Sequence, residues 1–279
     1  MVRVKLWGGL GNQMFQYALG RSLALKNRTY LQLDLSEYQD KNEAADYISR
    51  NFELDLFNVN YITESKENFI VTKILNYTSP VKYVQENGYV YDPSVLEKKG
   101  RLYLYGYWQC ENYFKSIEDT IREDFTFKKQ PNAANTQYLN QIAKVNAVSI
   151  HFRRGDYVTV QTAVNFNGIC TVDYYKNAIA QIKSKLENPH FFVFSDDLSW
   201  VKENIDFKDP HTYVDGNSGE YSYEDMRLMA ACKHNIIANS TFSWWGAWLN
   251  HNKDKVVVAP QNWFKTEKTD IIPDNWIKI

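Results

Sequence analysis

Four side chains within six residues have the chemistry to bind and neutralise a phosphate group. They lie in the segment AVSIHFRRGDY at residues 147–157 and are His151, Arg153, Arg154 and Asp156. Guanidinium groups grip phosphate oxygens in a bidentate fork. The intervening Gly155 allows a sharp backbone turn, and an Asp beside it either orients an Arg or accepts a proton. A strand end with a surface salt bridge is the alternative, and these residues alone favour neither interpretation.

A second segment, NSTFSWWGAW at residues 239–248, places small hydroxyl side chains directly before a predicted helix. Ser240, Thr241 and Ser243 are suited to cap that helix. The free N–H groups at a helix start carry positive potential, worth about 0.3–1 kcal/mol for an exposed anion. We therefore expect a phosphate to sit here, opposite the two arginines.

A third segment, WGGLGNQ at residues 7–13, lies between a predicted strand at 2–6 and a predicted helix at 13–26. A glycine-rich turn in this setting aims backbone N–H groups at an anion. The candidate ligand-binding residues here are Gly9, Gly11, Asn12 and Gln13. Asp34 ends the next predicted strand, as in a dinucleotide-binding fingerprint. Met14 stands where the third glycine belongs, so an NAD-dependent sugar-nucleotide enzyme is only an alternative.

The elements that must position the arginines alternate between strands and helices. Strands are predicted at 147–152, 190–195, 211–215, 235–238 and 255–259, and helices at 172–187, 198–204, 221–233 and 243–250. This alternation predicts an α/β fold with a doubly wound parallel sheet. Polar residues follow successive strands, and ligands of such sheets bind outside the carboxyl ends of the strands. The polar residues are therefore expected to form one site.

Acidic residues near these strand ends raise the question of a metal. Asp196 follows the second strand of the predicted sheet, and Asp225 lies on a predicted helix. A carboxylate is the natural partner of the N1–H and 2-amino donors of guanine, and a carboxylate pair is also a candidate metal ligand. Because the arginines already neutralise phosphate, we expect no metal and no other cofactor.

The polar stretch at 128–136 is the best linker candidate and divides the chain into two predicted domains. Residues 1–135 form a predicted N-terminal α/β lobe with the glycine-rich turn, and residues 136–279 form a predicted Rossmann-like, nucleotide-binding lobe. The N-terminal lobe contains a predicted strand at 101–109 and a helix at 111–125, while residues 36–100 show little pattern. Tyr107 and Trp108 are candidates for stacking on a sugar, and covering the core is the alternative.

Composition narrows the class of partner. The 279-residue chain has a formal net charge of −1 at pH 7, which gives no support to nucleic acid binding. Its 20 Tyr, 15 Phe and 8 Trp suit a carbohydrate ligand. The three cysteines are widely spaced, which fits a reducing compartment. No membrane span or signal peptide is evident, so we expect a cytoplasmic location and leave open a peripheral contact at the inner face of the membrane.

Four segments in the same order resemble the α-1,2-fucosyltransferases of glycosyltransferase family 11. They are GGLGNQMFQYA at 8–18, GYWQCENYF at 106–114, HFRRGDY at 151–157 and NSTFSWWGAWLN at 239–250. The resemblance implies a two-lobed GT-B-like fold, with the acceptor on the side of the N-terminal lobe at 1–135, and no metal. It also implies inverting transfer of L-fucose from GDP-β-L-fucose to the 2-hydroxyl of a terminal galactoside. A different GDP-sugar donor and a non-catalytic sugar-binding module remain alternatives.

The resemblance also implies residue roles. Arg153 is expected to hold the β-phosphate of the leaving GDP, and His151 to contact the nucleotide near the ribose. Asp196 and Asp225 resemble guanine-side carboxylates, and Ser240, Thr241 and Phe242 resemble the phosphate loop. Asn12 and Gln13 resemble donor-side residues of the N-terminal lobe. Asp156 is the nearest candidate for the base that accepts the acceptor proton, because the residues around Gln161 are neutral.

Overall fold

The computed structural model describes residues 1–39, 50–62, 79–155 and 168–279. The chain divides into two compact units. Unit 1 contains Met1–Lys129 and Glu267–Ile271, and unit 2 contains Gln130–Thr266 and Ile272–Ile279. The predicted boundary after residue 135 falls inside a helix, Ala133–Ile142, which belongs wholly to unit 2.

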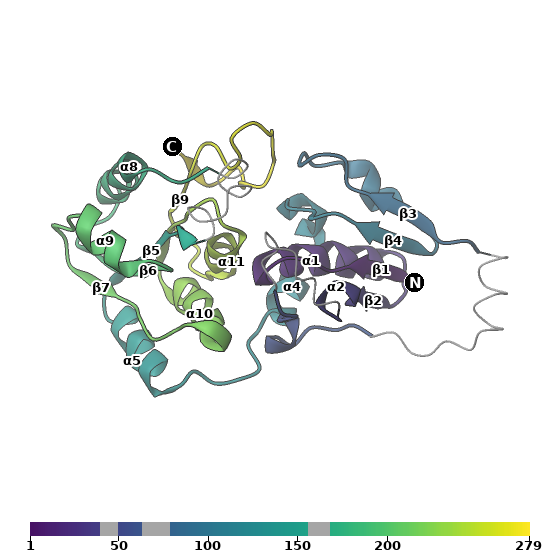
Figure 1. Ribbon diagram of the computed structural model, residues 1–279, viewed down its shortest axis with the longest axis horizontal. Coiled ribbons are helices and arrows are strands. Elements are labelled where there is room, and N and C mark those ends of the chain that lie inside the picture. The colour runs from purple at the N-terminus through teal and green to yellow at the C-terminus, as the bar shows by residue number, and fades with distance from the viewer. Residues whose placement is uncertain (40–49, 63–78, 156–167) are drawn as a thin grey trace. The chain divides into compact units, whose positions relative to one another are not determined.

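Unit 1 is built on a four-stranded sheet in the order β2-β1-β4-β3 (Figure 1). Its strands are β1 (Val2–Lys5), β2 (Leu31–Asp34), β3 (Lys82–Gln85) and β4 (Leu102–Tyr105). Its α-helices are α1 (Leu10–Lys26), α2 (Ser36–Gln39) and α4 (Glu118–Asp124). Short 3-10 helices lie at Leu54–Leu56, Pro93–Glu97, Glu111–Tyr113 and Lys115–Ile117. All neighbouring strands pair in parallel, so their carboxyl ends share one edge.

Unit 2 is built on a six-stranded sheet in the order β10-β9-β8-β5-β6-β7. Its strands are β5 (Asn146–Phe152), β6 (Pro189–Ser195), β7 (His211–Tyr213), β8 (His234–Ile236), β9 (Val257–Ala259) and β10 (Ile277–Lys278). Its helices are α5 (Ala133–Ile142), α8 (Val172–Lys183), α9 (Leu198–Asn204), α10 (Tyr223–Ala231) and α11 (Thr241–Leu249). Every strand pair is again parallel.

The two faces of the unit 2 sheet bury different helices. Val148, Ile150 and Phe152 alternate along β5 and pack into one cluster with residues of α8 and α9. Ala147, on the opposite face of the same strand, joins a second cluster with residues of α5 and α10. Successive side chains of a strand point to opposite faces, so this sheet is covered on both sides. The predicted α/β fold with a doubly wound parallel sheet is confirmed.

The boundary between the two units lies after Lys129, inside the predicted linker at 128–136, which extends into the start of α5. There the Asn132 side chain caps the helix by accepting from the Asn135 N–H. Other local predictions are wrong. The single helix predicted at 111–125 consists of two 3-10 helices followed by α4. Strand β3 lies within residues 36–100, where short helices and loops were predicted and no strand. None of the helices in the described segments is long and apolar enough to cross a membrane.

Candidate functional site

The carboxyl end of β5 is fixed by a buried tyrosine on α8. The Tyr175 hydroxyl donates to the His151 carbonyl at 3.1 Å and accepts the backbone N–H of Arg153. Tyr175 is only 2% exposed, and burial raises its pKa far above the ordinary value, so it stays a neutral donor. The chain therefore leaves the sheet in one defined direction where the two arginines begin.

Asp196 then holds the turn that carries these arginines. Strands β5 and β6 pair so that Phe152 lies opposite Ser195, which brings the residues that follow them side by side. One Asp196 carboxylate oxygen lies 2.8 Å from Arg153 Nη1, and the other accepts the Arg154 backbone N–H at 2.9 Å. A Cβ on Gly155 would lie 2.6 Å from that carboxylate, so a side chain at this position would displace it.

The two neighbouring arginines have different environments. The Arg154 guanidinium lies 3.8 Å from the centre of the Trp200 ring on α9, and its Nε is 3.5 Å from Asp197. Arg154 is therefore engaged with the protein through a cation–π contact and an ion pair. The Arg153 side chain is a quarter exposed and oriented by Asp196. Of the two arginines, Arg153 is the better placed to bind a phosphate.

His151 lies on the face of β5 opposite Val148 and Ile150. Its side chain is buried and 7% exposed, and its Nδ1 has no hydrogen-bond partner among the described residues. Burial, with a smaller contribution from the charge of Arg153, lowers its pKa to about 3. The imidazole is therefore neutral at physiological pH, and its Nδ1 remains available to a ligand hydroxyl or N–H.

The start of α11 lies beside this strand end. The centroids of the His151 and Phe242 rings are 6.2 Å apart. Ser240 occupies the N-cap position, but its side chain makes no capping hydrogen bond, and the Ser243 hydroxyl donates to the Ser240 carbonyl at 3.3 Å. The predicted capping by hydroxyl side chains is therefore wrong. The helix start keeps its positive potential for an anion, because its first turn also lacks an acidic residue.

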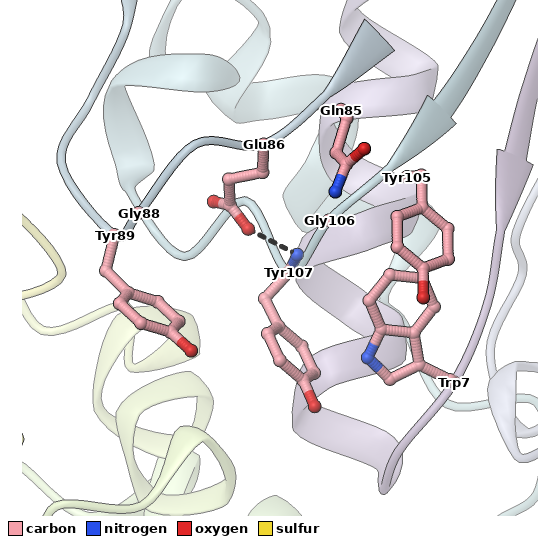
Figure 2. Close-up of a pocket in the computed structure, with 8 residues that line it drawn as sticks. All are labelled: Trp7, Gln85, Glu86, Gly88, Tyr89, Tyr105, Gly106 and Tyr107. Atoms are coloured by element: carbon pink, nitrogen blue, oxygen red, sulfur yellow. Dashed lines mark hydrogen bonds between the residues drawn. The ribbon is translucent and has the colours of Figure 1, made fainter. Parts of the chain in front are cut away.

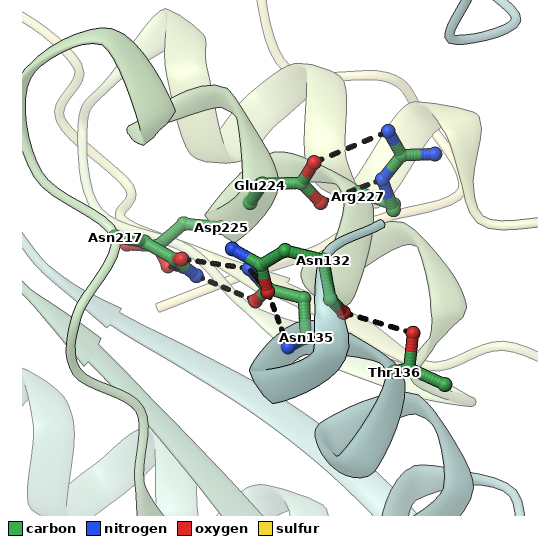
Figure 3. Close-up of polar contacts among 7 residues, drawn as sticks. All are labelled: Asn132, Asn135, Thr136, Asn217, Glu224, Asp225 and Arg227. Carbon is green, nitrogen blue, oxygen red and sulfur yellow. Dashed lines mark hydrogen bonds and ion pairs between the residues drawn. The ribbon is translucent and has the colours of Figure 1, made fainter. Parts of the chain in front are cut away.

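Asp225 lies in the first turn of α10, which begins at the same edge of the sheet. Its carboxylate accepts from the Asn217 side-chain amide at 2.9 Å, and Asn217 is paired with Asn135 at the capped start of α5 (Figure 3). Burial raises the pKa of Asp225 to about 7, against the lowering effect of the Asn217 hydrogen bond. Asp196, in contrast, uses both oxygens on the arginine turn. Each Asp196 oxygen could still accept a second hydrogen bond, so both predicted guanine-side carboxylates keep accepting capacity.

The glycine-rich turn of unit 1 is less open to ligand than its sequence indicates. Gly9 is the N-cap of α1, and Gly11 is buried in the first helical turn. Gln13 is fully buried: its amide donates to the carbonyls of Gly8 and Asn51, and its oxygen accepts the Glu53 N–H. It thus joins the turn to residues 51–53, and a direct donor contact is not available to it in this structure.

Asn12 differs from Gln13. Its side-chain oxygen accepts from the Gln109 amide at 2.9 Å, and the residue is half-buried. Asn12 is therefore the amide of this turn that lies nearer the surface. Asp156 lies outside the described residues, so its place relative to Arg153 stays a prediction.

Trp108 and Tyr107, the predicted sugar-stacking pair, separate in the structure. Trp108 is 1% exposed and packs edge-on against Tyr113 at 5.7 Å, so it covers the core and offers no stacking surface here. Tyr107 is half-buried and lines a pocket with Trp7 and Glu86. Sequence reasoning missed Trp7 and Glu86. Trp7 lies two residues after β1, at the start of the glycine-rich segment, and Glu86 directly follows β3.

Asp34, the acidic residue of the alternative dinucleotide-binding fingerprint, is occupied by contacts within the protein. Asp34 is 7% exposed, and its carboxylate accepts from the Tyr103 hydroxyl at 2.7 Å and from the Ser36 N–H at 3.0 Å. Arg3 lies 3.3 Å from the same carboxylate. An Asp with these partners is not available to hydrogen-bond the ribose of NAD. Within the described segments, no group of three or more His, Cys, Asp or Glu side chains is arranged to hold a metal ion.

Comparisons with known proteins show the family of the chain. The model of the family "Glycosyl transferase family 11" matches residues 1–279. An Escherichia coli protein named alpha-1,2-colitosyltransferase is 36% identical over 100% of this chain and 99% of its own length. The galactoside alpha-(1,2)-fucosyltransferase 1 of Saimiri sciureus is 28% identical over 53% of this chain and 43% of its own length.

A solved structure has the same fold. The NodZ alpha-1,6-fucosyltransferase co-crystallized with GDP superposes with a TM-score of 0.50 at 13% identity, covering 88% of this chain and 91% of that one. At this identity the likeness concerns the fold alone, which is of the GT-B-like type predicted. With a family match over its whole length, the chain belongs to glycosyltransferase family 11.

Proposed function

We propose that this protein transfers L-fucose from GDP-β-L-fucose to the 2-hydroxyl of a terminal galactoside, with inversion to an α-1,2 linkage. One observation carries the nucleotide part of this proposal. Arg153, oriented by Asp196, and the start of α11, which has no side-chain cap, lie at the carboxyl ends of the neighbouring strands β5 and β8. Together they form a positively polarised place for a diphosphate leaving group.

The reaction requires stabilisation of the charge that grows on the leaving group. The acceptor oxygen attacks the anomeric carbon of fucose while the bond from that carbon to the β-phosphate oxygen breaks. Negative charge then develops on the β-phosphate, and groups that bind it more strongly in the transition state raise the rate. By analogy with oxyanion donors, each such contact contributes about 2–4 kcal/mol. Arg153 and the N–H groups at the start of α11 are the groups assigned to this role.

The remaining roles follow from neutral and acidic groups. The neutral His151 imidazole contacts the nucleotide near the ribose, and Asp225 accepts from the guanine edge. Asp156 accepts the proton of the acceptor hydroxyl. No metal is needed in this scheme, because Arg153 and the helix start neutralise the diphosphate. Turnover in excess EDTA should equal turnover with added Mg²⁺ if this is correct.

GDP-colitose is the second candidate donor, because a full-length relative is named as a colitosyltransferase. This donor differs from GDP-fucose by the loss of one sugar hydroxyl. GDP release should therefore be measured with lactose and equal concentrations of GDP-fucose, GDP-colitose and GDP-mannose. The proposal predicts the highest kcat/KM with GDP-fucose. A preference for GDP-colitose would change the donor, and equal use of GDP-mannose would contradict selection for a 6-deoxy sugar.

A further inference from the structure

Unit 1 has a pocket at the edge of its own sheet, and of the residues that line it only Tyr107 was predicted above to bind a ligand. Trp7 follows β1, Gly106 and Tyr107 follow β4, and Gln85 and Glu86 lie at the end of β3. These three strands are parallel neighbours, so the pocket lies outside their carboxyl ends, where α/β sheets bind ligands. The cavity measures about 200 Å³. Drug-sized ligands occupy pockets of roughly 300–1,000 Å³, so this one suits a single ring.

Aromatic rings form one side of this pocket. The Trp7 ring lies 4.4 Å from Tyr105 and 5.2 Å from Tyr107, measured between centroids (Figure 2). Tyr105 is 43% exposed, while Trp7 and Tyr107 are half-buried. The Trp7 backbone N–H is held by the buried Gln16 side chain at 3.2 Å. Rings that are fixed and yet reachable from solvent suit the apolar C–H face of a sugar.

A carboxylate forms the opposite side. The Glu86 side chain accepts the backbone N–H of Tyr107 at 2.6 Å and that of Trp108 at 2.9 Å. Gly106 permits this approach, because a Cβ there would lie 2.4 Å from the Glu86 Cβ. Each carboxylate oxygen can accept a second hydrogen bond, so Glu86 keeps accepting capacity toward the pocket. Burial raises its pKa to about 7, which shows that the two backbone N–H groups do not fully replace water.

Three acidic side chains act on the tyrosines of the pocket. Glu86 and Glu267 act electrostatically on Tyr89, and Glu86 and Glu37 act on Tyr107. Lys5 lies 5.8 Å from the centre of the Tyr105 ring and is paired with Glu37 at 3.3 Å. A neutral polyol with donor hydroxyl groups suits such a lining better than a phosphate does. The two units therefore carry side chains suited to different ligands. Unit 2 carries the groups for a diphosphate, and the unit 1 pocket has aromatic faces with one hydroxyl acceptor.

We propose that this pocket binds the terminal β-galactose ring of the acceptor, with the ring face on Trp7, Tyr105 and Tyr107 and a sugar hydroxyl donating to Glu86. This inference deepens the proposed function and rests on it for the identity of the acceptor. It replaces the predicted Tyr107–Trp108 pair by Tyr107 together with residues at the carboxyl ends of β1, β3 and β4. Glu86 is a substrate-binding residue in this assignment.

The test compares two tyrosine variants on the same sheet. Tyr105→Ala removes a ring of the pocket at an exposed position, and Tyr83→Ala removes a ring that is 79% exposed and contacts Tyr103 instead. Tyr105→Ala should raise the KM for lactose by about tenfold, the effect of losing one stacked ring. Tyr83→Ala should leave it within about twofold. Both variants should keep the wild-type Kd for GDP.

Two further measurements keep the inference separate from the proposed function. Saturation-transfer NMR with lactose and GDP, without donor, should show lactose contacts that Tyr105→Ala weakens and Tyr83→Ala keeps. Glu86→Gln should weaken the same signal while its thermal melting stays cooperative. Contacts that depend on Tyr105, in a protein that transfers no fucose, would support the pocket and contradict the proposed function.

Other outcomes would overturn the inference. Fucose transfer to lactose with an unchanged KM in Tyr105→Ala would leave the function standing and remove the pocket as the acceptor site. Binding of GDP with no saturation-transfer signal from lactose would contradict the assignment of the pocket to a galactose ring. An aromatic pocket beside a carboxylate can also hold a quaternary ammonium group. Choline contacts in place of lactose contacts would therefore contradict the assignment.

Discussion

Replacing Asp196 by Asn tests whether this residue orients Arg153 or contacts guanine. In the structure, Asp196 lies 2.8 Å from Arg153 Nη1 and accepts the Arg154 N–H at 2.9 Å. Asn keeps an oxygen for that N–H but loses the charge that holds the guanidinium. The expected result is a lower kcat, because Arg153 would no longer be fixed where the β-phosphate charge develops.

The size of the effect follows from the geometry and the exposure of the pair. A hydrogen bond to a charged group contributes about 1.5–3 kcal/mol when buried, and an exposed ion pair contributes about 0–1 kcal/mol. Both side chains are a quarter exposed, which places the pair between these limits. A loss of about 1–2 kcal/mol corresponds to a roughly 5- to 30-fold lower kcat.

The assay is GDP release at saturating lactose, together with competitive inhibition by GDP and by ADP. A matched control is Asp209→Asn, which removes an exposed ion pair to Lys183 at 2.9 Å on the same unit. The control should leave kcat within about twofold. An Asp196→Asn enzyme with a normal kcat and equal inhibition by GDP and ADP would refute the reasoning. Loss of the preference for GDP would show that Asp196 contacts guanine and does not orient Arg153.

Three further predictions concern single residues. Arg153→Lys should reduce kcat nearly as much as Arg153→Ala, by roughly 10²–10³-fold, because an ammonium cannot form the bidentate fork. A Lys variant with most of the wild-type kcat would contradict the binding of the β-phosphate by Arg153. Asp156→Asn should abolish acceptor-dependent GDP release if Asp156 is the base, and near-normal turnover would exclude it. The contribution of Glu86 to the free energy of unfolding should fall as pH rises from about 4.5 to about 7. Its pKa is about 7 in the folded protein and about 4.5 in the unfolded chain, so the carboxyl of the unfolded chain loses its proton at lower pH. The titratable groups that face it are phenols, which stay neutral because their pKa values are raised: Tyr89, Tyr107 and Tyr113. Urea unfolding of wild type and Glu86→Gln across this range should diverge by at most about 3 kcal/mol at neutral pH, and parallel curves would contradict the raised pKa.

The sheet of unit 2 and the place of its site could be predicted because both depend on local patterns. Buried strands such as 147–152 and 190–195 are short apolar runs, and the polar residues at their ends meet in any parallel sheet. The resemblance predicted Arg153 for the phosphate, but the different environments of Arg153 and Arg154 could not be predicted from the sequence. They depend on Trp200 and Asp196, which lie more than forty positions away along the chain and are recognised only by their contacts.

Unit 1 shows the same limit more strongly. Gln13 has the residue type and setting of a ligand contact, yet its amide is used by Asn51 and Glu53. Strand β3 is four residues long with three exposed side chains, so it carries no apolar run to detect. Glu86 follows that strand and was missed with it. The pocket could not be predicted, because its residues come together only through the parallel pairing of β1, β4 and β3.

The central claim is that this family 11 enzyme joins fucose to the 2-hydroxyl of a galactoside. The most direct measurement is to incubate the wild-type protein with GDP-fucose and lactose, and then to analyse the product by mass spectrometry and two-dimensional NMR. The account predicts a product that carries one added deoxyhexose, with an α-anomeric proton coupled through the linkage to carbon 2 of galactose. A fucosylated product linked at another position, or unmodified lactose alongside bound GDP, would contradict it.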